Sequence, residues 1–430
     1  MKLSRKLLML LAVLLSFSLI AAACGDDDDD ADAGDDMADA DLGTITVEAG
    51  AEVQIRSLNV LTGVNSVLGI PNQNGIELAV EDYGDIKEFA VTSGQGLDDL
   101  CSSEGGQAAA QTIVADEQIV GVIGTSCSNA AVAAAPLIAD AGIVMISGSN
   151  TSPALTSDLV GNAGESYNPG YYRTAHNDLF QGAAMAEFVY NELGFESAAA
   201  IHDGDPYTQG LAQAFSNAFE DLGGTMTGFT SVAVGDTDMV PVLTEIAQGA
   251  PEALFFPIFR DPGDLLADQA SGVAGLENVQ LIAADGLWND EFLALEQSEG
   301  MYFSGPDVRF GENVNESTGM SANDVLAAYE AKVGEGPTAP FWGHSYDATA
   351  MLLDAIDAAS EVDGDGNLVI DKAGVRAYLN GITGYSGIIG TISCDEFGDC
   401  GSQKITIIKH DDSSDVAASN ANVVFEYAPE

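Results

Sequence analysis

The sequence predicts an α/β protein made of two doubly wound lobes. From residue 53 onward, short apolar strands alternate with helical patterns, which is typical of βαβ units and a parallel sheet. A second series of the same kind begins near Tyr171, so the chain contains two sequential units of domain size. The chain has 430 residues, of which 46% are apolar, and it is therefore long enough to bury a sizeable core.

The first series opens with a strand over residues 53–61. Ile76, Ala79, Val80 and Tyr83 then recur at the spacing of one helix face. Later elements complete one doubly wound half. They are a strand near residues 89–92, a helix near 107–115, a buried strand at 119–124, a helix from about 129 to 139 and a strand at 143–146.

The second series is followed by a helix-rich segment and a closing hairpin. We expect lobe 1 to contain residues 44–170 and 310–400, and lobe 2 to contain residues 171–309 and 401–430. The expected elements are a helix near residues 181–193, a strand at 198–202, a helix with an apolar face at 211–222, strands at 253–256 and 280–283, a helix-rich segment at 321–360, a hairpin at 394–400 and a strand at 405–408.

The first residues predict a secretory leader. Basic residues precede an apolar run at 7–23, which is too short to span a bilayer comfortably. The stretch LIAAACG at residues 19–25 resembles a bacterial lipobox, which predicts a signal peptide at 1–23 and a lipid on Cys24. Ordinary cleavage at an Ala-x-Ala site is the alternative. Residues 24–43 are rich in aspartate and small residues, so we expect a solvated acidic tether there.

The charge of the chain excludes one class of partner. Asp and Glu total 67 against 13 Lys and Arg, for a formal net charge of −54. Such a chain repels nucleic acid and anionic bilayer surfaces, so we expect no nucleic-acid partner and membrane attachment only through the lipid. No lysine directly follows a glycine, so the Gly-Lys step of the ATPase phosphate loop is absent from the sequence.

Four cysteines remain once Cys24 is lipidated, and three pairings are possible. In an oxidising exterior they should form disulfides. We favour Cys101 with Cys127, which links the loops after successive strands, and Cys394 with Cys400, which clamps a turn. Free thiols in a core are the alternative.

Two motifs fall short of catalytic or metal sites. GHSYD at residues 343–347 nearly matches the nucleophile elbow of hydrolases, but Asp347 replaces the second glycine. A secreted serine hydrolase using Ser345 therefore remains the less favoured alternative, and we expect no enzyme activity. DGDGN at residues 363–367 begins like a calcium-binding loop, yet Leu368 and Gly374 break the pattern, which favours a turn. We expect no metal and no cofactor.

Two polar turns predict a binding site for a carboxylate. The strand ending at Gly124 leads through TSCS into a helix, which puts Ser128 near a helix N-terminus with free backbone N–H groups. The next strand ends at Ser147 and opens the turn GSNT at residues 148–151. Both turns should lie at the carboxyl ends of adjacent strands, where ligands of open α/β sheets bind. The alternative is that both turns only cap helices.

This segment resembles the leucine/isoleucine/valine-binding proteins, which are type I periplasmic binding proteins of ABC importers. The most specific parts are the cysteine pair, the Cys127-Ser128 step, and MIS at residues 145–147 followed by Thr151 and Pro153. The likeness covers nearly the whole chain after the leader. It implies two Rossmann-like lobes with a hinge, three crossings between the lobes, and closure over one amino acid.

The resemblance also implies roles for six residues. Ser128, Ser149 and Thr151 match positions that bind the α-carboxylate of the ligand, and Asp285 matches the acid that pairs with the α-ammonium. Tyr207 and Phe259 match aromatic positions of the pocket in the second lobe. Packing within the lobe is the alternative for these two rings, and a solvated loop position is the alternative for the acid.

The sequence departs from the family at two positions. Asp285 stands where the family usually has glutamate, and Leu68 replaces an aromatic residue near a loop of the first lobe. The zwitterion of an amino acid needs both an anion cradle and a buried acid, and the matched residues supply both. We expect small aliphatic amino acids of the branched-chain type to fit this site best.

The expected function follows from this resemblance. We expect an extracytoplasmic solute-binding protein, anchored to the cell membrane by a lipid on Cys24, that works as a monomer and presents an amino acid to an ABC permease with a separate ATPase subunit. The alternative function is that of a ligand-binding sensor domain, which would have the same fold but would pass its signal to a receptor.

Overall fold

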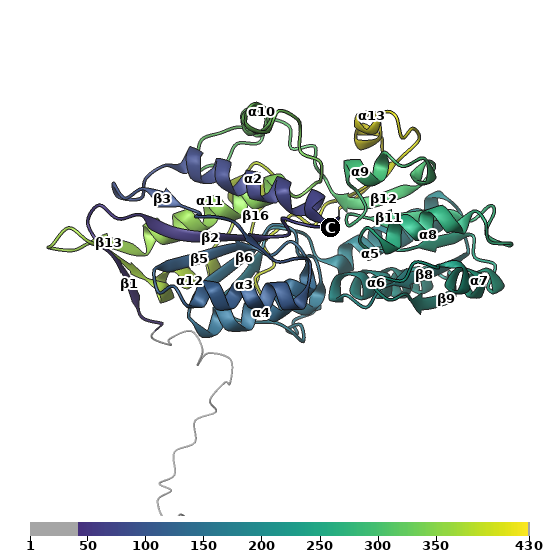
Figure 1. Cartoon of the computed structure of the whole chain (residues 1–430), viewed down its shortest axis with the longest axis horizontal. Helices are drawn as coiled ribbons and strands as arrows, with labels where there is room; N and C mark the ends of the chain where they lie inside the picture. The colour runs from purple at the N-terminus through teal and green to yellow at the C-terminus, as the bar shows by residue number, and fades with distance from the viewer. Residues whose placement is uncertain (1–41, 429–430) are drawn as a thin grey trace, which may run out of the picture. The chain divides into compact units, whose positions relative to one another are not determined.

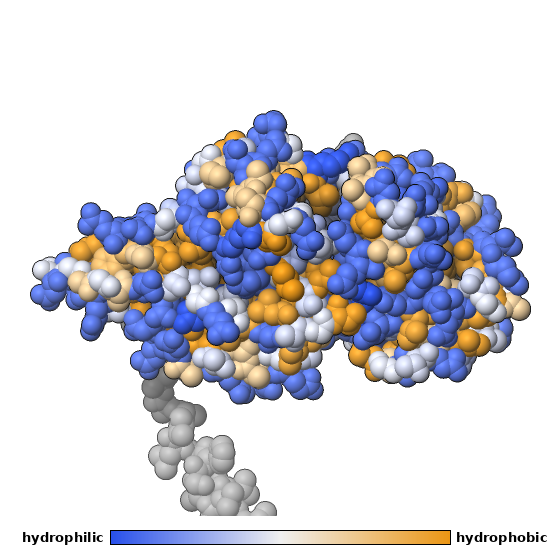
Figure 2. All heavy atoms as spheres, turned by 45° about the horizontal axis from the view of Figure 1, so that its top comes forward, coloured by the Kyte–Doolittle hydropathy of each residue, from blue (hydrophilic) through white to orange (hydrophobic). Residues whose placement is uncertain are grey.

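A computed structural model describes residues 42–428, which form two α/β lobes (Figure 1). The predicted signal peptide, Cys24 and almost all of the predicted tether lie outside these residues. Both lobes are doubly wound, so the predicted fold class is confirmed. Within residues 42–428, no helix combines the length and apolar character needed to cross a bilayer. Hydrophilic residues are spread over both lobes on the face shown in Figure 2, as the acidic composition requires.

The first lobe contains a six-stranded sheet in the order β3-β2-β5-β6-β7, with β4 also paired to β2. Every pairing in this sheet is parallel. Helices α3 and α4 pack on one face, whereas α2 and α11 pack on the other (Figure 1). The elements are β2 (Val53–Asn59), α2 (Ser66–Tyr83), β3 (Val91–Thr92), β4 (Leu97–Asp98), α3 (Ser103–Val114), β5 (Ile119–Gly124), α4 (Ser128–Asp140), β6 (Val144–Ser147), β7 (Tyr171–Arg173) and α11 (Trp342–Ala358).

The second lobe contains a seven-stranded sheet in the order β18-β17-β12-β11-β10-β8-β9. Helices α5 and α6 cover one face of this sheet, and α7 and α8 cover the other. The pairs β12–β17 and β17–β18 are antiparallel, and the other pairs of the sheet are parallel. The elements are α5 (Asp178–Glu187), β8 (Ser197–His202), α6 (Pro206–Asp221), β9 (Thr225–Ser231), α7 (Val240–Gln248), β10 (Ala253–Phe255), α8 (Pro262–Ala270), β11 (Gln280–Ala284), β12 (Tyr302–Pro306), β17 (Ile405–Lys409) and β18 (Val423–Tyr427).

Smaller elements surround the two sheets. A three-stranded sheet in the order β1-β14-β13 and a hairpin of β15 and β16 belong to the first lobe. The bounds are β1 (Thr44–Val47), α9 (Asp290–Leu293), α10 (Ala322–Val333), β13 (Ser360–Val362), β14 (Leu368–Asp371), α12 (Lys372–Asn380), β15 (Tyr385–Gly387), β16 (Gly390–Ile392) and α13 (Val416–Ala421).

Three segments carry the chain between the two sheets. They follow β7, β12 and the turn that ends at Cys400. The first crossing comes after Arg173, because β7 pairs with β6 in the first sheet, and thus lies slightly beyond the expected boundary at residue 170. The prediction of a hairpin at residues 394–400 is wrong. The hairpin is formed earlier in the chain by β15 and β16, and residues 394–400 form a turn.

Both predicted disulfides form. Cys101 pairs with Cys127, which ties the loop before α3 to the loop before α4, and Cys394 pairs with Cys400. The second disulfide closes the turn in which the backbone N–H of Asp395 donates to the carbonyl of Asp399. This turn leads directly into the third crossing.

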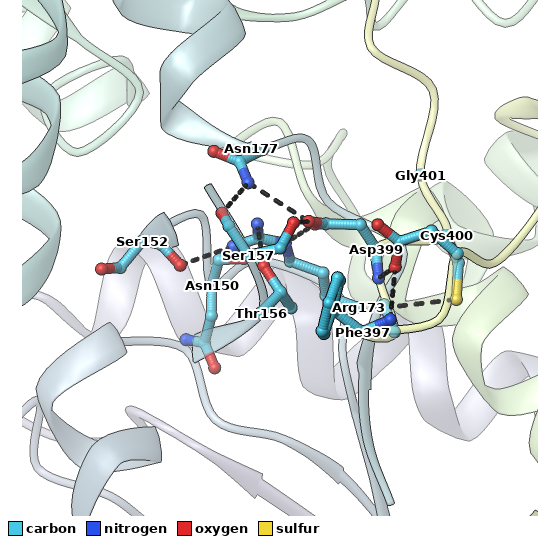
Figure 3. A network of polar contacts seen from close by, with 12 residues as sticks. Asn150, Ser152, Thr156, Ser157, Arg173, Asn177, Phe397, Asp399, Cys400 and Gly401 are labelled. Carbon is cyan, nitrogen blue, oxygen red and sulfur yellow. Dashed lines mark hydrogen bonds and ion pairs between the residues drawn. The ribbon is translucent and has the colours of Figure 1, made fainter. Parts of the chain in front are cut away.

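A buried ion pair joins the first and third crossings (Figure 3). The Arg173 guanidinium, which has no exposed surface, pairs with Asp399, and Asp399 also accepts from the Asn177 side chain at 3.2 Å. Arg173 donates further to the Ser152 carbonyl at 2.8 Å and to the Thr156 hydroxyl at 2.6 Å. One side chain therefore fixes the loop after β6 and both adjoining crossings.

We predict that Arg173→Met destabilises the protein by about 3–5 kcal/mol, because it leaves the Asp399 carboxylate buried without its counterion. The matched control is Lys409→Met, which breaks the 2.6 Å pair of Lys409 with Asp411 at the surface and should cost at most about 1 kcal/mol. Urea unfolding of both variants measures the difference. Equal loss of stability in the two variants would contradict the structural role of the buried pair.

Candidate ligand-binding site

All six residues that the resemblance assigned to a ligand meet at one pocket between the lobes. The pocket encloses about 370 Å³ of space, counting the part that is open to solvent. Its walls come from the carboxyl ends of β5, β6 and β11, the loop after β10, the first turns of α2 and α6, and the segment before α11. The lining residues are Leu68, Ser126, Ser128, Ser149, Thr151, Tyr207, Phe259, Asp285, Gly286, Ala339 and Phe341.

The start of α4 forms the donor side of the pocket. Ser128 is the first residue of this helix and is buried, and no side chain caps the helix at Cys127. The first N–H groups of a helix have no partner within the helix and carry partial positive charge. The Ser128 hydroxyl oxygen accepts from the backbone N–H of Ser152 at 3.4 Å, so its own proton remains free to donate.

The turn after β6 lies beside this helix start. The Ser147 hydroxyl accepts from the backbone N–H groups of Ser149 and Asn150, at 3.1 and 2.9 Å, which folds the turn back on its strand. The Ser149 hydroxyl accepts from the Asn72 amide at 3.1 Å and donates to the Ser126 carbonyl at 3.2 Å. Because the Ser149 hydroxyl is already used inside the lobe, Ser128 and Thr151 are the stronger candidates to donate to an anion.

The second lobe contributes an aromatic wall. Tyr207 stands in the first turn of α6, where Asp205 caps the helix by accepting from its backbone N–H at 2.8 Å. The ring of Tyr207 lies 5.2 Å from that of Phe259. The Tyr207 hydroxyl donates to Asp285 Oδ1 at 3.2 Å and accepts from the backbone N–H of Gly286 at 3.0 Å. These bonds tie the wall to the loop after β11.

Asp285 follows β11 and is the acidic group of the pocket. It is 6% exposed and, among residues 42–428, forms no ion pair. Its donors are neutral, since Gln181 Nε2 lies 2.7 Å from Oδ1 and the Tyr207 hydroxyl lies 3.2 Å away. Burial raises the pKa of Asp285 to about 6, and these two hydrogen bonds limit the rise. The site thus holds an acid whose charge the described protein does not balance.

A second buried acid lies behind the pocket and was missed from the sequence. Asp178 is the first residue of α5, is fully buried, and its backbone N–H donates to the Thr151 carbonyl at 3.0 Å. Burial raises the pKa of Asp178 far above its usual value, and the charge of Asp285 raises it further. An Asn-Asp pair at a helix start is an ordinary capping pattern, so nothing in the sequence indicated that Asp178 would be buried next to the pocket.

The apolar end of the pocket was also only partly predicted. Ala339 and Phe341 come from the segment before α11, nearly 200 residues after the two polar turns. They line the pocket together with Leu68, which lies in the first turn of α2. No local pattern marks Ala339 or Phe341 as pocket residues, because only the tertiary fold brings their segment to the cleft.

Neither discarded motif forms a reactive site. Ser345 lies inside α11, where it is buried and packs so closely on Gly148 that a side chain at Gly148 would collide with its hydroxyl. An elbow requires a sharp strand-to-helix turn, which is not present there. Residues 363–367 form the predicted turn, closed by a hydrogen bond from the Asp363 N–H to the Asn367 carbonyl. No group of acidic, histidine or cysteine side chains suited to a metal occurs within residues 42–428.

Comparison with known proteins agrees with this architecture. The family model described as periplasmic binding protein matches residues 52–415. The chain belongs to the periplasmic binding protein family. The resemblance seen in the sequence is thereby confirmed for family and fold.

Three members or structural neighbours illustrate the family. The Leu/Ile/Val-binding protein homolog 3 of Brucella melitensis is 29% identical over 370 residues, which cover 85% of this chain and 93% of that protein. A leucine binding protein from Thermotoga maritima has a TM-score of 0.74 at 25% identity and covers 88% of this chain and 99% of its own. A solute-binding protein from R. palustris, solved with benzoate, shares the fold at TM-score 0.69 and 16% identity, covering 88% and 98%.

In this periplasmic binding protein, Asp285→Asn should stabilise the ligand-free form at neutral pH. The folded-state pKa of about 6 exceeds the ordinary value of 3.8, so the destabilising effect of the acid is absent below pH 4 and complete above pH 6 to 7. The expected gain is about 3 kcal/mol at pH 7.5 and about 0.5 kcal/mol at pH 4. Urea unfolding at both pH values tests this, and an equal effect at pH 4 and 7.5 would contradict it.

Proposed function

We propose that this protein is the solute-binding component of an ABC importer and that it captures a small aliphatic α-amino acid between its lobes. The observation that carries this proposal is Asp285, a buried carboxylate whose donors within the described part of the chain are all neutral. It lies on the opposite lobe from the donors at Ser128 and Thr151. A zwitterion supplies one charge for each end of such a pocket. Two charge-assisted hydrogen-bond sets then act on one ligand.

The ligand would lie with its α-carboxylate toward α4. The Ser128 hydroxyl, Thr151 and the free N–H groups of the helix start would donate to it. The α-ammonium would pair with Asp285, which lowers the free energy of an acid that is otherwise buried without a counterion. An aliphatic side chain would contact Leu68 and Phe341 at the apolar end.

Closure of the lobes would complete the site and signal that it is occupied. Ser128 and Asp285 belong to different lobes, so a ligand that binds both favours the closed arrangement. Three crossings connect the lobes and would act as the hinge. The closed form is what a permease would recognise, with transport energy supplied by a separate ATPase subunit.

The proposal includes the place of the protein in the cell. A lipid on Cys24 and the acidic residues that follow would hold the binding lobes outside the membrane as a monomer. The net charge of −54 would keep the lobes off the anionic bilayer surface, so the lipid would be the sole attachment.

Calorimetry with leucine, isoleucine and valine tests the ligand class. We expect at least one of them to bind, and to stabilise the protein by about 3 kcal/mol at a hundredfold excess over Kd. 4-Methylpentanoate lacks the ammonium and 3-methylbutylamine lacks the carboxylate, so both should bind at least about 100-fold more weakly, since each leaves one buried polar end unpaired. Tighter binding of 4-methylpentanoate or benzoate than of every amino acid would contradict the proposal.

Two variants and one control assign the ends of the pocket. Asp285→Asn should remove most of the affinity for leucine, and Ser128→Ala should reduce it about tenfold, the loss of one hydrogen bond to a charged group. Ser216→Ala is the matched control, because Ser216 is also buried but donates within α6 to the Ala212 carbonyl at 2.8 Å. Unchanged leucine affinity in both site variants would overturn the assignment.

A further inference from the structure

A buried glutamine connects the acid of the pocket, which follows β11, to the middle of β12. Gln181 lies in the first turn of α5 and has no exposed surface. Its Nε2 group donates to Asp285 Oδ1 at 2.7 Å, to the Ser304 carbonyl at 3.0 Å and to the Ser304 hydroxyl at 3.1 Å. Carboxylates and carbonyls only accept hydrogen bonds, so the NH₂ end of the amide must face Asp285 and Ser304.

The other end of this amide contacts a buried histidine. Gln181 Oε1 lies 2.5 Å from His176 Nε2, and His176 has no exposed surface. Because an amide oxygen only accepts, His176 Nε2 must carry the proton. His176 Nδ1 is buried and has no hydrogen-bond partner among residues 42–428, and burial lowers the pKa of His176 to about 4. The ring is therefore a neutral donor with one defined tautomer, and it prevents the amide from turning its oxygen toward Asp285.

The same histidine contacts the apolar end of the pocket. Its ring stacks on Phe341 with centroids 5.9 Å apart and an angle of 28° between the planes. His344 packs against the edge of Phe341 at 5.3 Å. The charged groups that act on His176 are Arg173 and Asp399, which form the buried ion pair of the crossings. His176 thus lies between the Arg173–Asp399 ion pair and two parts of the pocket, namely Asp285, which it reaches through Gln181, and Phe341.

We propose that Gln181 and His176 are positioning residues that hold Asp285 with its free oxygen toward the ligand ammonium. Neither side chain lines the pocket, so they act through Asp285. This inference rests on the proposed function and names the device that sets its specificity for an ammonium group. The Gln181 hydrogen bond also favours the ionised form of Asp285, which is the form that binds a cation.

The test measures leucine affinity of the full chain by calorimetry between pH 5 and 8.5. Gln181→Met keeps the length of the side chain and removes the donor. We expect leucine to bind at least tenfold more weakly at pH 7, with the rise of affinity with pH shifted upward, because Asp285 then ionises less readily. Gln269→Met is the matched control, since Gln269 is bonded at both amide ends to Met239 and Thr237 outside the pocket, and it should leave both quantities unchanged.

A second pair of variants separates positioning from packing. His176→Gln keeps a donor at the place of Nε2 and should retain most of the affinity, whereas His176→Leu should behave like Gln181→Met in both affinity and pH profile. If the wild type binds leucine and both donor-removing variants bind equally well with the same pH profile, the inference is overturned and the proposed function stands. If the wild type binds no amino acid at any pH, the proposed function fails and the inference fails with it.

Discussion

The buried carboxylate of Asp285 is the constraint on which the site depends. An acid in a low-dielectric cleft is expensive unless a counterion or several donors accompany it. Here two neutral donors, Gln181 and Tyr207, hold the group in place, and its pKa stays raised at about 6. Such a site stabilises the free protein less than a paired acid would, and the proposed ligand would supply the missing positive charge. If Asp285 binds the ligand as proposed, affinity and stability place opposite requirements on this one residue.

The fold supplies the two halves of this arrangement from different sheets. The start of α4 presents unpartnered N–H groups and Ser128 at the carboxyl end of β5, and Asp285 follows β11 in the other lobe. Neither lobe alone carries both ends. The Arg173–Asp399 pair fixes the loop that carries Thr151 to the crossings, so the geometry of the donors and the hinge share one network (Figure 3). In the proposed mechanism, hinge closure and ligand recognition would therefore be coupled through this network.

The sequence predicted most of the residues that line the pocket, because the polar ones lie where strands end. Ser128 and Thr151 follow buried apolar strands directly, and β5 has the predicted bounds. His176 and Gln181 lacked any such mark, since a polar residue in a helix or a crossing usually faces water. Two strands of the second sheet were missed for a related reason. The edge strand β9 is half exposed and mixes threonine, glycine and serine. The interior strand β12 ends in Gly305 and Pro306, both weak strand formers. Only long-range packing reveals these roles.

Proton release on ligand binding tests the central claim most directly. At pH 6 the Asp285 carboxyl is about half protonated in the free protein, and pairing with an ammonium must drive that proton off, so about half a proton should leave per leucine bound. Titration calorimetry in buffers of different ionisation enthalpy measures this number. The account predicts release at pH 6 that disappears at pH 8 and in Asp285→Asn. Leucine binding at pH 6 with no proton exchange would contradict it.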